Sequence, residues 1–233
     1  MSNNDHVMTK LNSQQEQVII GTVLGDGGLY IRDGGKCNAL FKVTHREADK
    51  EYLFWKYEML KSSGIFLRPP SRRLKKARHE GGHVYFHWKL SSRRLPIFTA
   101  YHKMFYPNGK KIVTQEILDR LEPLGLAVWY MDDGSLVSRS PRIRKSGIVH
   151  LVAGRNMSLS TMGFTYEENV LIRGWILERF NILFRVSRHY QLWGLRLGRR
   201  AEVNKFLDII RPYLVPCMER KFKEEKVNMK GVK

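Results

Sequence analysis

The sequence predicts an α+β fold built from two copies of one unit, each with the element order αββαββα. Two observations carry this prediction. An apolar run that ends at an Asp-Gly pair occurs twice, with Asp26 and Asp133 at matching points. Further along each copy, segments 92–95 and 198–201 both contain paired arginines and follow the two aspartates at nearly the same distance. Landmarks that recur in one order at nearly one spacing indicate an internal duplication.

Each copy begins with its apolar run, which is continuous enough for a buried helix. We expect Gly27 and Gly134, directly after the two aspartates, to adopt the left-handed conformation that glycine favours at helix ends. Alternating sequence then predicts hairpins, with turns at 33–35, 80–82 and Ser140-Pro141. The expected elements are a first hairpin over 29–45 and 135–160, an amphipathic helix over 47–62 and 166–180, a second hairpin over 71–91 and 183–197, and a last helix over 95–105 and 200–210.

The two halves are expected to divide the chain near its middle. We place the first half at residues 14–115 and the second at residues 116–222, and we expect the polar ends, 1–13 and 223–233, to be flexible. Hydrophobic residues make up 42% of the sequence, which is enough for a sizeable buried core.

The charge balance is strongly basic. Lysine and arginine total 41 against 22 acidic residues, which gives a formal net charge of +19 and an isoelectric point near 10.1. A surplus of this size raises self-repulsion in the folded state, and a polyanionic partner offsets it. Nucleic acid is the leading candidate, because each phosphate that is neutralised releases condensed counterions. A merely basic, soluble protein is the alternative that composition leaves open.

Several classes of protein are disfavoured. Cys37 and Cys217 are isolated, with no Cys or His partner at metal-binding spacing, so zinc fingers, iron–sulfur clusters and a disulfide framework do not fit. No apolar run reaches the roughly 18 residues of a membrane span, and residues 1–17 lack the apolar core of a signal peptide. We therefore expect action inside a cell, in a mitochondrion or other organelle or in phage or prokaryotic cytoplasm, without a membrane partner.

The predicted strands are unusually cationic. Phe86, Trp88 and Leu90 alternate with His87 and Lys89, so one strand face is expected to be buried and the other to be cationic. A two-stranded ribbon fits the major groove of DNA, where Arg and Lys read guanine and Gln reads adenine. A solvated outer face is the alternative for any single residue, but cationic strands in both halves favour DNA. The predicted DNA contacts are Arg32, Lys42, Arg72, Arg73, Lys75, Lys76, Arg78, His87, Lys89, Arg139, Arg142, Arg144, Lys145, Arg185, Arg188, Gln191 and Arg196.

Asp26 and Asp133 are the candidate metal ligands. One Asp-Gly pair after a helix is ordinarily a turn or cap, so the prediction depends on the duplication. Hydrolysis of a phosphodiester needs an activated water, charge neutralisation and help for the leaving oxygen, and carboxylate-bound Mg²⁺ provides all three. If the two apolar helices pack side by side, the two aspartates meet and serve two DNA strands. The histidines without metal-binding spacing are expected to be surface or strand residues: His45, His79, His83, His87, His102, His150 and His189.

These residues carry a family resemblance. Residues 19–27, Ile-Ile-Gly-Thr-Val-Leu-Gly-Asp-Gly, resemble the nine-residue motif of LAGLIDADG homing endonucleases, and residues 126–134 resemble its second copy. The pattern is most similar to single-chain, intron-encoded members, in which an aromatic pair also precedes Met-Asp-Asp-Gly. Lys110-Lys111 and the segment 211–216 followed by Lys221 extend the resemblance over residues 14–222. The motif positions that depart from the pattern, Ile19-Ile20, Leu24, Val128 and Met131, leave both aspartates in place.

The resemblance implies a pseudo-twofold fold whose antiparallel sheets form a saddle over double-stranded DNA. It implies a monomer that cuts both strands to leave 3′ overhangs. Asp26 and Asp133 would bind Mg²⁺ together with the backbone carbonyls of Gly25 and Asp132. Mn²⁺ is expected to substitute for Mg²⁺, and Ca²⁺ to support binding without cleavage. The catalytic lysines of the family correspond to Lys111 and Lys221, which would orient water or stabilise transition-state charge, with an ordinary phosphate contact as the alternative for each.

Two other functions fit the same fold. One is an RNA-binding maturase that helps an intron to splice, and the other is a non-catalytic DNA-binding regulator. Both aspartates and both lysines are present, which favours the enzyme, because paired carboxylates without a metal would repel phosphate. No splice-junction blocks flank the repeat, so we expect a free-standing enzyme rather than an intein.

Overall fold

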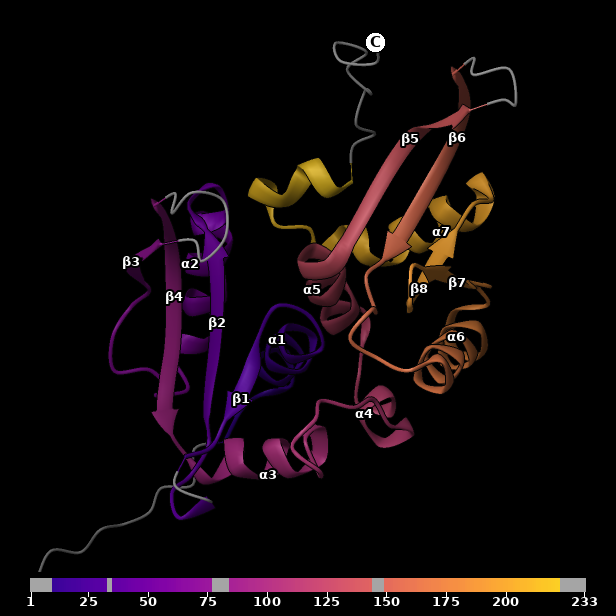
Figure 1. Ribbon diagram of the computed structural model, residues 1–233. Coiled ribbons are helices and arrows are strands. Elements are labelled where there is room, and N and C mark those ends of the chain that lie inside the picture. The colour runs from indigo at the N-terminus through magenta and orange to yellow at the C-terminus, as the bar shows by residue number, and fades with distance from the viewer. Residues whose placement is uncertain (1–9, 33–34, 77–83, 144–148, 223–233) are drawn as a thin grey trace, which may run out of the picture. The chain divides into compact units, whose positions relative to one another are not determined.

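The computed structural model describes residues 10–32, 35–76, 84–143 and 149–222 (Figure 1). Arg78, Arg144, Lys145 and the predicted turn at 80–82 lie outside the described residues. The chain divides into two compact units, Met1–Asn108 and Gly109–Lys233. This division assigns the segment that contains Lys111 to the second unit.

The first unit follows the predicted order. Its sheet has the strand order β1-β2-β4-β3, and all pairs are antiparallel. Helix α2 packs on β2 and β4, while α3 packs on β1 and β2. The elements are α1 (Ser13–Leu24), β1 (Gly28–Tyr30), β2 (Leu40–Arg46), the 3-10 helix η2 (Glu47–Asp49), α2 (Lys50–Lys61), β3 (Ser71–Lys76), β4 (Val84–Arg94) and α3 (Pro96–Phe105).

The second unit repeats this order after one additional short helix. Its sheet has the order β5-β6-β8-β7, again antiparallel throughout, with α6 against β7 and β8 and α7 against β6. The elements are α4 (Gln115–Asp119), α5 (Pro123–Asp133), β5 (Gly134–Ile143), β6 (Val149–Leu159), α6 (Tyr166–Phe180), β7 (Arg185–His189), β8 (Leu192–Leu197), α7 (Arg200–Ile210), and the 3-10 helices η3 (Arg211–Tyr213) and η4 (Pro216–Lys221). The predicted duplication of αββαββα is therefore confirmed.

Helices α1 and α5 are the two predicted apolar helices. Asn12 caps α1 and exchanges hydrogen bonds with Gln15, which sets where the helix begins. Residues 17–24 of α1 and 124–132 of α5 are buried all round, as expected for helices that are apolar on every face. Helix α1 ends two residues before Asp26, and α5 ends at Asp133. Within the described ranges, no helix combines the length and apolar character needed to cross a membrane.

The prediction of left-handed glycines after the two helices was wrong. Gly134 has φ −80°, and among the described residues the glycines with positive φ are Gly35, Gly64 and Gly109. Glycine is needed at Gly27 and Gly134 because of close approach. A Cβ on Gly27 would lie 2.6 Å from Thr22 Cγ2, and a Cβ on Gly134 would overlap the ring and carbonyl of Tyr130.

The predicted turn at Ser140-Pro141 was also wrong. Strand β5 continues through both residues, and Pro141 pairs with Leu151 in β6. Strand β5 lies at an edge of its sheet, where a residue without a backbone N–H is tolerated. The connection to β6 falls later, after Ile143.

Candidate active site and nucleic-acid interface

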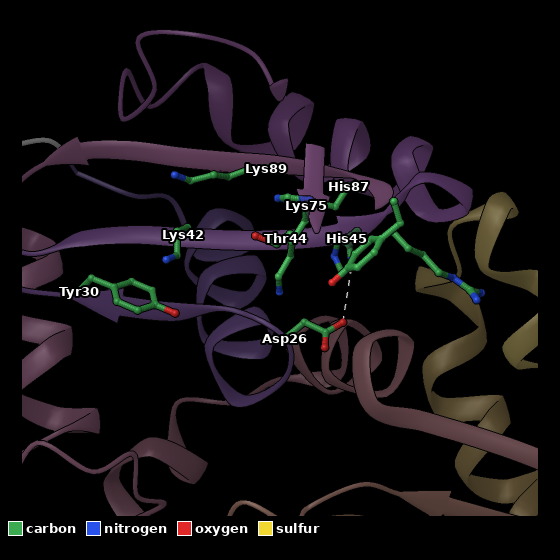
Figure 2. A pocket seen from close by; sticks show the side chains of 10 residues that line it. Asp26, Tyr30, Lys42, Thr44, His45, Lys75, His87 and Lys89 are labelled. Carbon is green, nitrogen blue, oxygen red and sulfur yellow. Dashed lines mark ion pairs between the residues drawn. The ribbon is translucent and has the colours of Figure 1, made fainter. Parts of the chain in front are cut away.

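Asp26 lies in the short connection between α1 and β1. The backbone N–H of Gly25 still bonds to Gly21, and that of Gly27 bonds to Thr22, so the chain leaves the helix tightly. The Asp26 side chain is 42% exposed, and its Oδ2 lies 3.5 Å from Nδ1 of His45 (Figure 2). Asp26 therefore projects from the end of a buried helix toward strand β2.

A groove of about 550 Å³ opens beside Asp26 within the first unit. Figure 2 shows the side chains of β1, β2, β3 and β4 that project into it. Its lining residues are Asp26, Tyr30, Lys42, Thr44, His45, Arg46, Lys75, Tyr85, His87 and Lys89. Asp26 is the single acidic residue of this lining, at the edge of an otherwise neutral and basic surface.

Strand register explains why the basic side chains gather there. Thr44 pairs with Lys89, and Arg46 pairs with His87. On the other edge of β4, Arg73 pairs with His87 and Lys75 pairs with Tyr85. Residues directly opposite each other share a sheet face, so three strands contribute their cations to one side.

The electrostatics of the groove reflect this crowding. Partial burial, together with the positive charges of Lys42, Arg73 and Arg32, lowers the pKa of Lys89. Partial burial, together with Lys75 and Lys89, also lowers the pKa of His87. Cations that depress each other's pKa values make a site in which a polyanion relieves repulsion. Two of them lie over aromatic rings: Lys42 Nζ is 3.8 Å from the Tyr30 ring centroid and Lys75 Nζ is 5.9 Å from that of Tyr85.

Arg72 lies on the opposite face of the sheet. Its guanidinium donates to Glu47 at 2.9 Å and stacks 3.6 Å from the ring centroid of Phe86. The hydrogen bond from Arg72 holds the pKa of Glu47 below its usual range. Lys76 falls on the same face by register, whereas Arg32 is exposed in the loop after β1. Of the predicted DNA contacts in the first unit, four line the groove: Lys42, Lys75, His87 and Lys89. Arg73 lies on the same sheet face by register, whereas Arg72 lies on the opposite face.

The predicted burial of the Phe86 face holds for only part of β4. Leu90 is buried and Trp88 is half-buried against Phe54 of α2, but Phe86 is 42% exposed. Phe86 lies beyond His87, the last residue of β4 that pairs with β2, and its ring contacts the guanidinium of Arg72. The alternation of apolar and polar residues in β4 therefore predicts the two faces of the strand correctly. It overestimates how deeply Phe86, near the β3 hairpin, is buried.

The second sheet also has a polar face. Arg196 of β8 pairs with Arg185 of β7 and with Ser158 of β6, and these alternate with the buried Leu195 and Leu159. Arg196 and Arg185 are both exposed. The pattern matches the cationic face of the first unit, with fewer described charges.

The other predicted DNA contacts of the second unit lie away from the pair formed by Arg185 and Arg196. Arg188 pairs with Trp193 and lies 5.9 Å from its ring centroid, on the side where Trp193 meets Tyr166 of α6. Gln191 is exposed in the turn between β7 and β8. Arg139 and Arg142 lie in β5, opposite Ala153 and His150.

Asp133 is the last residue of α5, and Lys221 lies against the backbone on both sides of it. Nζ of Lys221, at the end of η4, donates to the carbonyls of Asp132 at 3.0 Å and Gly134 at 2.7 Å. The hydroxyl of Tyr130 donates in turn to the carbonyl of Lys221 at 2.8 Å. Burial raises the pKa of Tyr130, so this hydroxyl remains a donor. The C-terminal 3-10 helix is thereby fixed beside the second aspartate.

Lys111 occupies a less specific place. It is half-buried in the segment before α4, with Nζ 5.9 Å from the ring centroid of Phe164. Its neighbour Lys110 is exposed. The other predicted catalytic lysine, Lys221, lies directly against the backbone on both sides of Asp133.

The donor atoms fit a hard divalent cation. The first unit offers the Asp26 carboxylate just after α1, and the second offers the carboxylates of Asp132 and Asp133 at the end of α5. Backbone carbonyls lie next to them, and Mg²⁺ and Ca²⁺ prefer such oxygen ligands. In the second unit these carbonyls already face a positive charge, the Lys221 ammonium. Carbonyl oxygens that accept hydrogen bonds from an ammonium can also bind a metal cation, because both are positively charged.

His45 is the site residue that the sequence did not reveal. Its chain spacing suggests no metal site, yet its side chain is 5% exposed and faces Asp26. The proximity arises because β2 runs antiparallel to β1, with Gly28 opposite Lys42. Tyr30, Thr44, Arg46 and Tyr85 of the groove were likewise not predicted as site residues.

The family model of the LAGLIDADG DNA endonuclease family matches residues 16–206. This chain therefore belongs to that family. The expected resemblance and the duplicated α+β fold are both confirmed.

Curated relatives match over most of this chain. Protein RecA of Mycobacterium shimoidei is 27% identical over 215 residues, which cover 91% of this chain and 47% of the relative. The cytochrome b mRNA maturase bI2 of Debaryomyces hansenii is 26% identical over 216 residues, which cover 91% of this chain and 74% of the relative. The chain spans about half the length of the RecA relatives that it matches.

Solved structures share the fold. The homing endonuclease I-WcaI, bound to its DNA recognition sequence, aligns with a TM-score of 0.77 and 20% identity, over 97% of this chain and 96% of that one. Meganuclease I-SmaMI, bound to uncleavable DNA, aligns with a TM-score of 0.53 and 12% identity, over 88% of this chain and 85% of that one.

Proposed function

We propose that this protein is a site-specific endonuclease that binds a long duplex DNA target and hydrolyses both strands with Mg²⁺. The observation that carries this proposal is the placement of Asp26 at the edge of a groove that is otherwise lined by neutral and basic residues. A basic sheet face attracts the phosphate backbone, and a carboxylate at its edge is unfavourable there unless a cation offsets it. Membership of the DNA endonuclease family supports the same function.

DNA would lie across the cationic faces of the two sheets. Lys42, Lys75 and Lys89 in the first unit and Arg185 and Arg196 in the second would contact phosphates or guanine edges, and Gln191 would suit adenine. These assignments distinguish groove residues from Arg72, which faces away from the groove. The protein would act as a monomer, because one chain provides both halves.

The cation would be held by Asp26 and Asp133, with the carbonyls of Gly25 and Asp132 as further oxygen ligands. Bound Mg²⁺ would polarise the scissile phosphate and lower the pKa of an attacking water. Mn²⁺ would substitute for it, Ca²⁺ would support binding without cutting, and the products would carry 3′ overhangs. Lys221 would contribute positive charge beside Asp133, since its ammonium already lies against the flanking carbonyls. Lys111 would have the same role with less structural support.

An RNA maturase is the second candidate. One relative that covers most of this chain is named a cytochrome b mRNA maturase. A basic sheet face with exposed Tyr30 and Tyr85 would also accept RNA, whose unstacked bases pack on aromatic rings. A non-catalytic DNA-binding regulator remains a third candidate, but it leaves the paired aspartates without a role.

Incubation with the uninterrupted DNA that flanks the protein's own gene tests the proposal. With Mg²⁺ we expect one specific double-strand break, and with Ca²⁺ we expect a stable complex without a break. The control is the double variant Asp26→Asn/Asp133→Asn, which should bind the same DNA and not cut it. Binding without cutting by the wild-type protein in Mg²⁺ and Mn²⁺ would contradict the enzyme. Tighter binding to the corresponding intron RNA than to the DNA would favour the maturase.

A further inference from the structure

A fully buried lysine lies behind the first aspartate. Lys56, in the middle of α2, is 0% exposed and shares its helix face with the buried Tyr52, Leu53 and Leu60. A buried ammonium costs several kcal/mol unless it has polar partners. Nζ of Lys56 lies 3.3 Å from Nε2 of His45 and 4.4 Å from the ring centroid of Tyr52. The lysine is therefore held in place by a histidine and by the face of an aromatic ring.

His45 connects this lysine to Asp26. Its Nε2 faces Lys56, and its Nδ1 lies 3.5 Å from the Asp26 carboxylate, as the dashed line in Figure 2 marks. An ammonium has only hydrogens to donate, so Nε2 must accept. The ring proton then resides on Nδ1, which donates toward Asp26. Lys56 thereby sets the tautomer of His45 that orients the carboxylate.

The second unit has different residues at the corresponding positions. Leu29 pairs with Phe41 in the first sheet, and Leu136 pairs with Met157 in the second, which aligns the two units. The same spacing aligns His45 with Thr161 and Lys56 with Ile172. Thr161 is buried and donates to the side chain of Asn169 in α6, whose amide caps the carbonyls of Thr161, Phe164 and Thr165. The second unit therefore has a neutral polar pair and an isoleucine where the first has two basic side chains.

We propose that His45 and Lys56 are positioning residues for the Asp26 carboxylate, at positions where the second unit has Thr161 and Ile172. The proposal rests on the proposed function, in which Asp26 binds the divalent cation. Removal of Lys56 takes away the ammonium that donates to Nε2 of His45, so the ring is held less firmly with its proton on Nδ1 and with Nδ1 toward Asp26. Outer-shell changes of this kind typically lower metal affinity or activity by about 10–100-fold. The loss belongs to the first unit, so the cleavage of one strand should slow first and nicked DNA should accumulate.

The test compares Lys56→Met and the double variant His45→Thr/Lys56→Ile with wild type. The double variant installs the residues of the second unit, and Lys50→Met is the matched control, because it removes the same charge from an exposed position on α2. We expect a roughly tenfold weaker Mn²⁺ affinity in calorimetry and a nicked intermediate on end-labelled duplex in both test variants. Affinity for DNA and thermal stability should stay at the wild-type level in Lys56→Met, since methionine fills the same buried space. Lys50→Met should match wild type in all four measurements.

A second readout needs neither metal nor cutting. Nitrogen chemical shifts of His45 in the free wild-type protein should report the single tautomer with hydrogen on Nδ1, and those in Lys56→Met should report a mixture of the two tautomers. An unchanged tautomer in Lys56→Met would overturn the pairing itself. A changed tautomer together with wild-type Mn²⁺ affinity and equal cutting of both strands would overturn the positioning role while the proposed endonuclease stands. If wild type cuts no DNA, the proposed function fails, and Mn²⁺ affinity and the tautomer still decide whether the pair positions Asp26.

Discussion

The surroundings of Asp26 and Asp133 differ more than the two motifs do. Asp26 is approached by side chains, His45 from β2 and behind it Lys56 from α2. On both sides of Asp133, backbone carbonyls accept from Lys221 of the 3-10 helix η4. Duplication placed the two aspartates at matching positions of the repeat, at or just beyond the end of its first helix, while the side chains around them diverged. Aspartates at equal positions in a repeat can therefore be held by different residues. We expect different substitutions to impair the two halves.

Replacement of either aspartate should have the largest effect. We expect Asp26→Asn and Asp133→Asn each to slow double-strand cutting by at least ~10²-fold, because an amide binds a hard cation poorly and leaves transition-state charge unbalanced. Binding to the target should survive, since neither residue contributes positive charge. Cleavage of end-labelled duplex and gel-shift titration measure the two effects separately. If either variant cuts both strands at the wild-type rate, the aspartate that it replaces is not a metal ligand.

Lys221 is specific to the second half and should have the next largest effect. Lys221→Met removes the ammonium from the two carbonyls beside Asp133, and we expect cutting in the saturated complex to slow by roughly 10–100-fold. Arg220→Met is the control, because it removes one exposed positive charge from the same 3-10 helix. If the affinity of Lys221→Met drops tenfold and its saturated rate is unchanged, the lysine is only a phosphate contact.

The two glycines that follow the aspartates offer a comparison of stability. In Gly134→Ala the new Cβ would overlap the buried Tyr130 ring and its carbonyl, whereas in Gly27→Ala it would lie 2.6 Å from Thr22 Cγ2 and 2.9 Å from its carbonyl. We expect both to lower the free energy of unfolding by about 1–3 kcal/mol, with the larger loss at Gly134.

A helical glycine provides the control for this pair. Gly174 of α6 has open space around its Cα, so Gly174→Ala should raise stability by about 0.5–1 kcal/mol in urea unfolding. A Gly134→Ala variant as stable as Gly174→Ala would show that the helix end is not tightly packed.

The two faces of the first sheet should give the smallest effects. Lys75→Ala removes a cation of the groove, and we expect the slope of log affinity against log salt to fall by about 0.9. Arg72→Ala removes the same charge from the opposite face, where the guanidinium pairs with Glu47, and should leave the slope unchanged. Equal slopes for both variants would show that DNA does not distinguish the faces.

The sequence was sufficient for the fold and for the position of the two aspartates near the ends of the apolar helices, because apolar periodicity and a repeated Asp-Gly pair are local patterns. The metal-binding role of the aspartates stays a prediction. The sequence did not predict contacts that depend on how the strands pair and which sheet face a side chain occupies. The contact between His45 and Asp26 depends on the register of β1 against β2, and Arg72 differs from Arg73 only in which face of β3 it occupies. Pro141 was predicted as a turn because edge position is not visible in a strand's own residues. The left-handed conformation predicted for Gly27 and Gly134 was wrong, because the close approach of Thr22 and Tyr130 that leaves no room for a Cβ is not visible in the sequence.

Calorimetric titration of Ca²⁺ into the DNA complex tests most directly whether Asp26 and Asp133 hold the divalent cation. Ca²⁺ is suited to this measurement because we expect it to bind without cutting. The predicted result is saturable Ca²⁺ binding by the wild-type complex and at least tenfold weaker binding by the complexes of Asp26→Asn and Asp133→Asn. Ca²⁺ binding to both variant complexes with wild-type affinity and stoichiometry would contradict the assignment of the two aspartates.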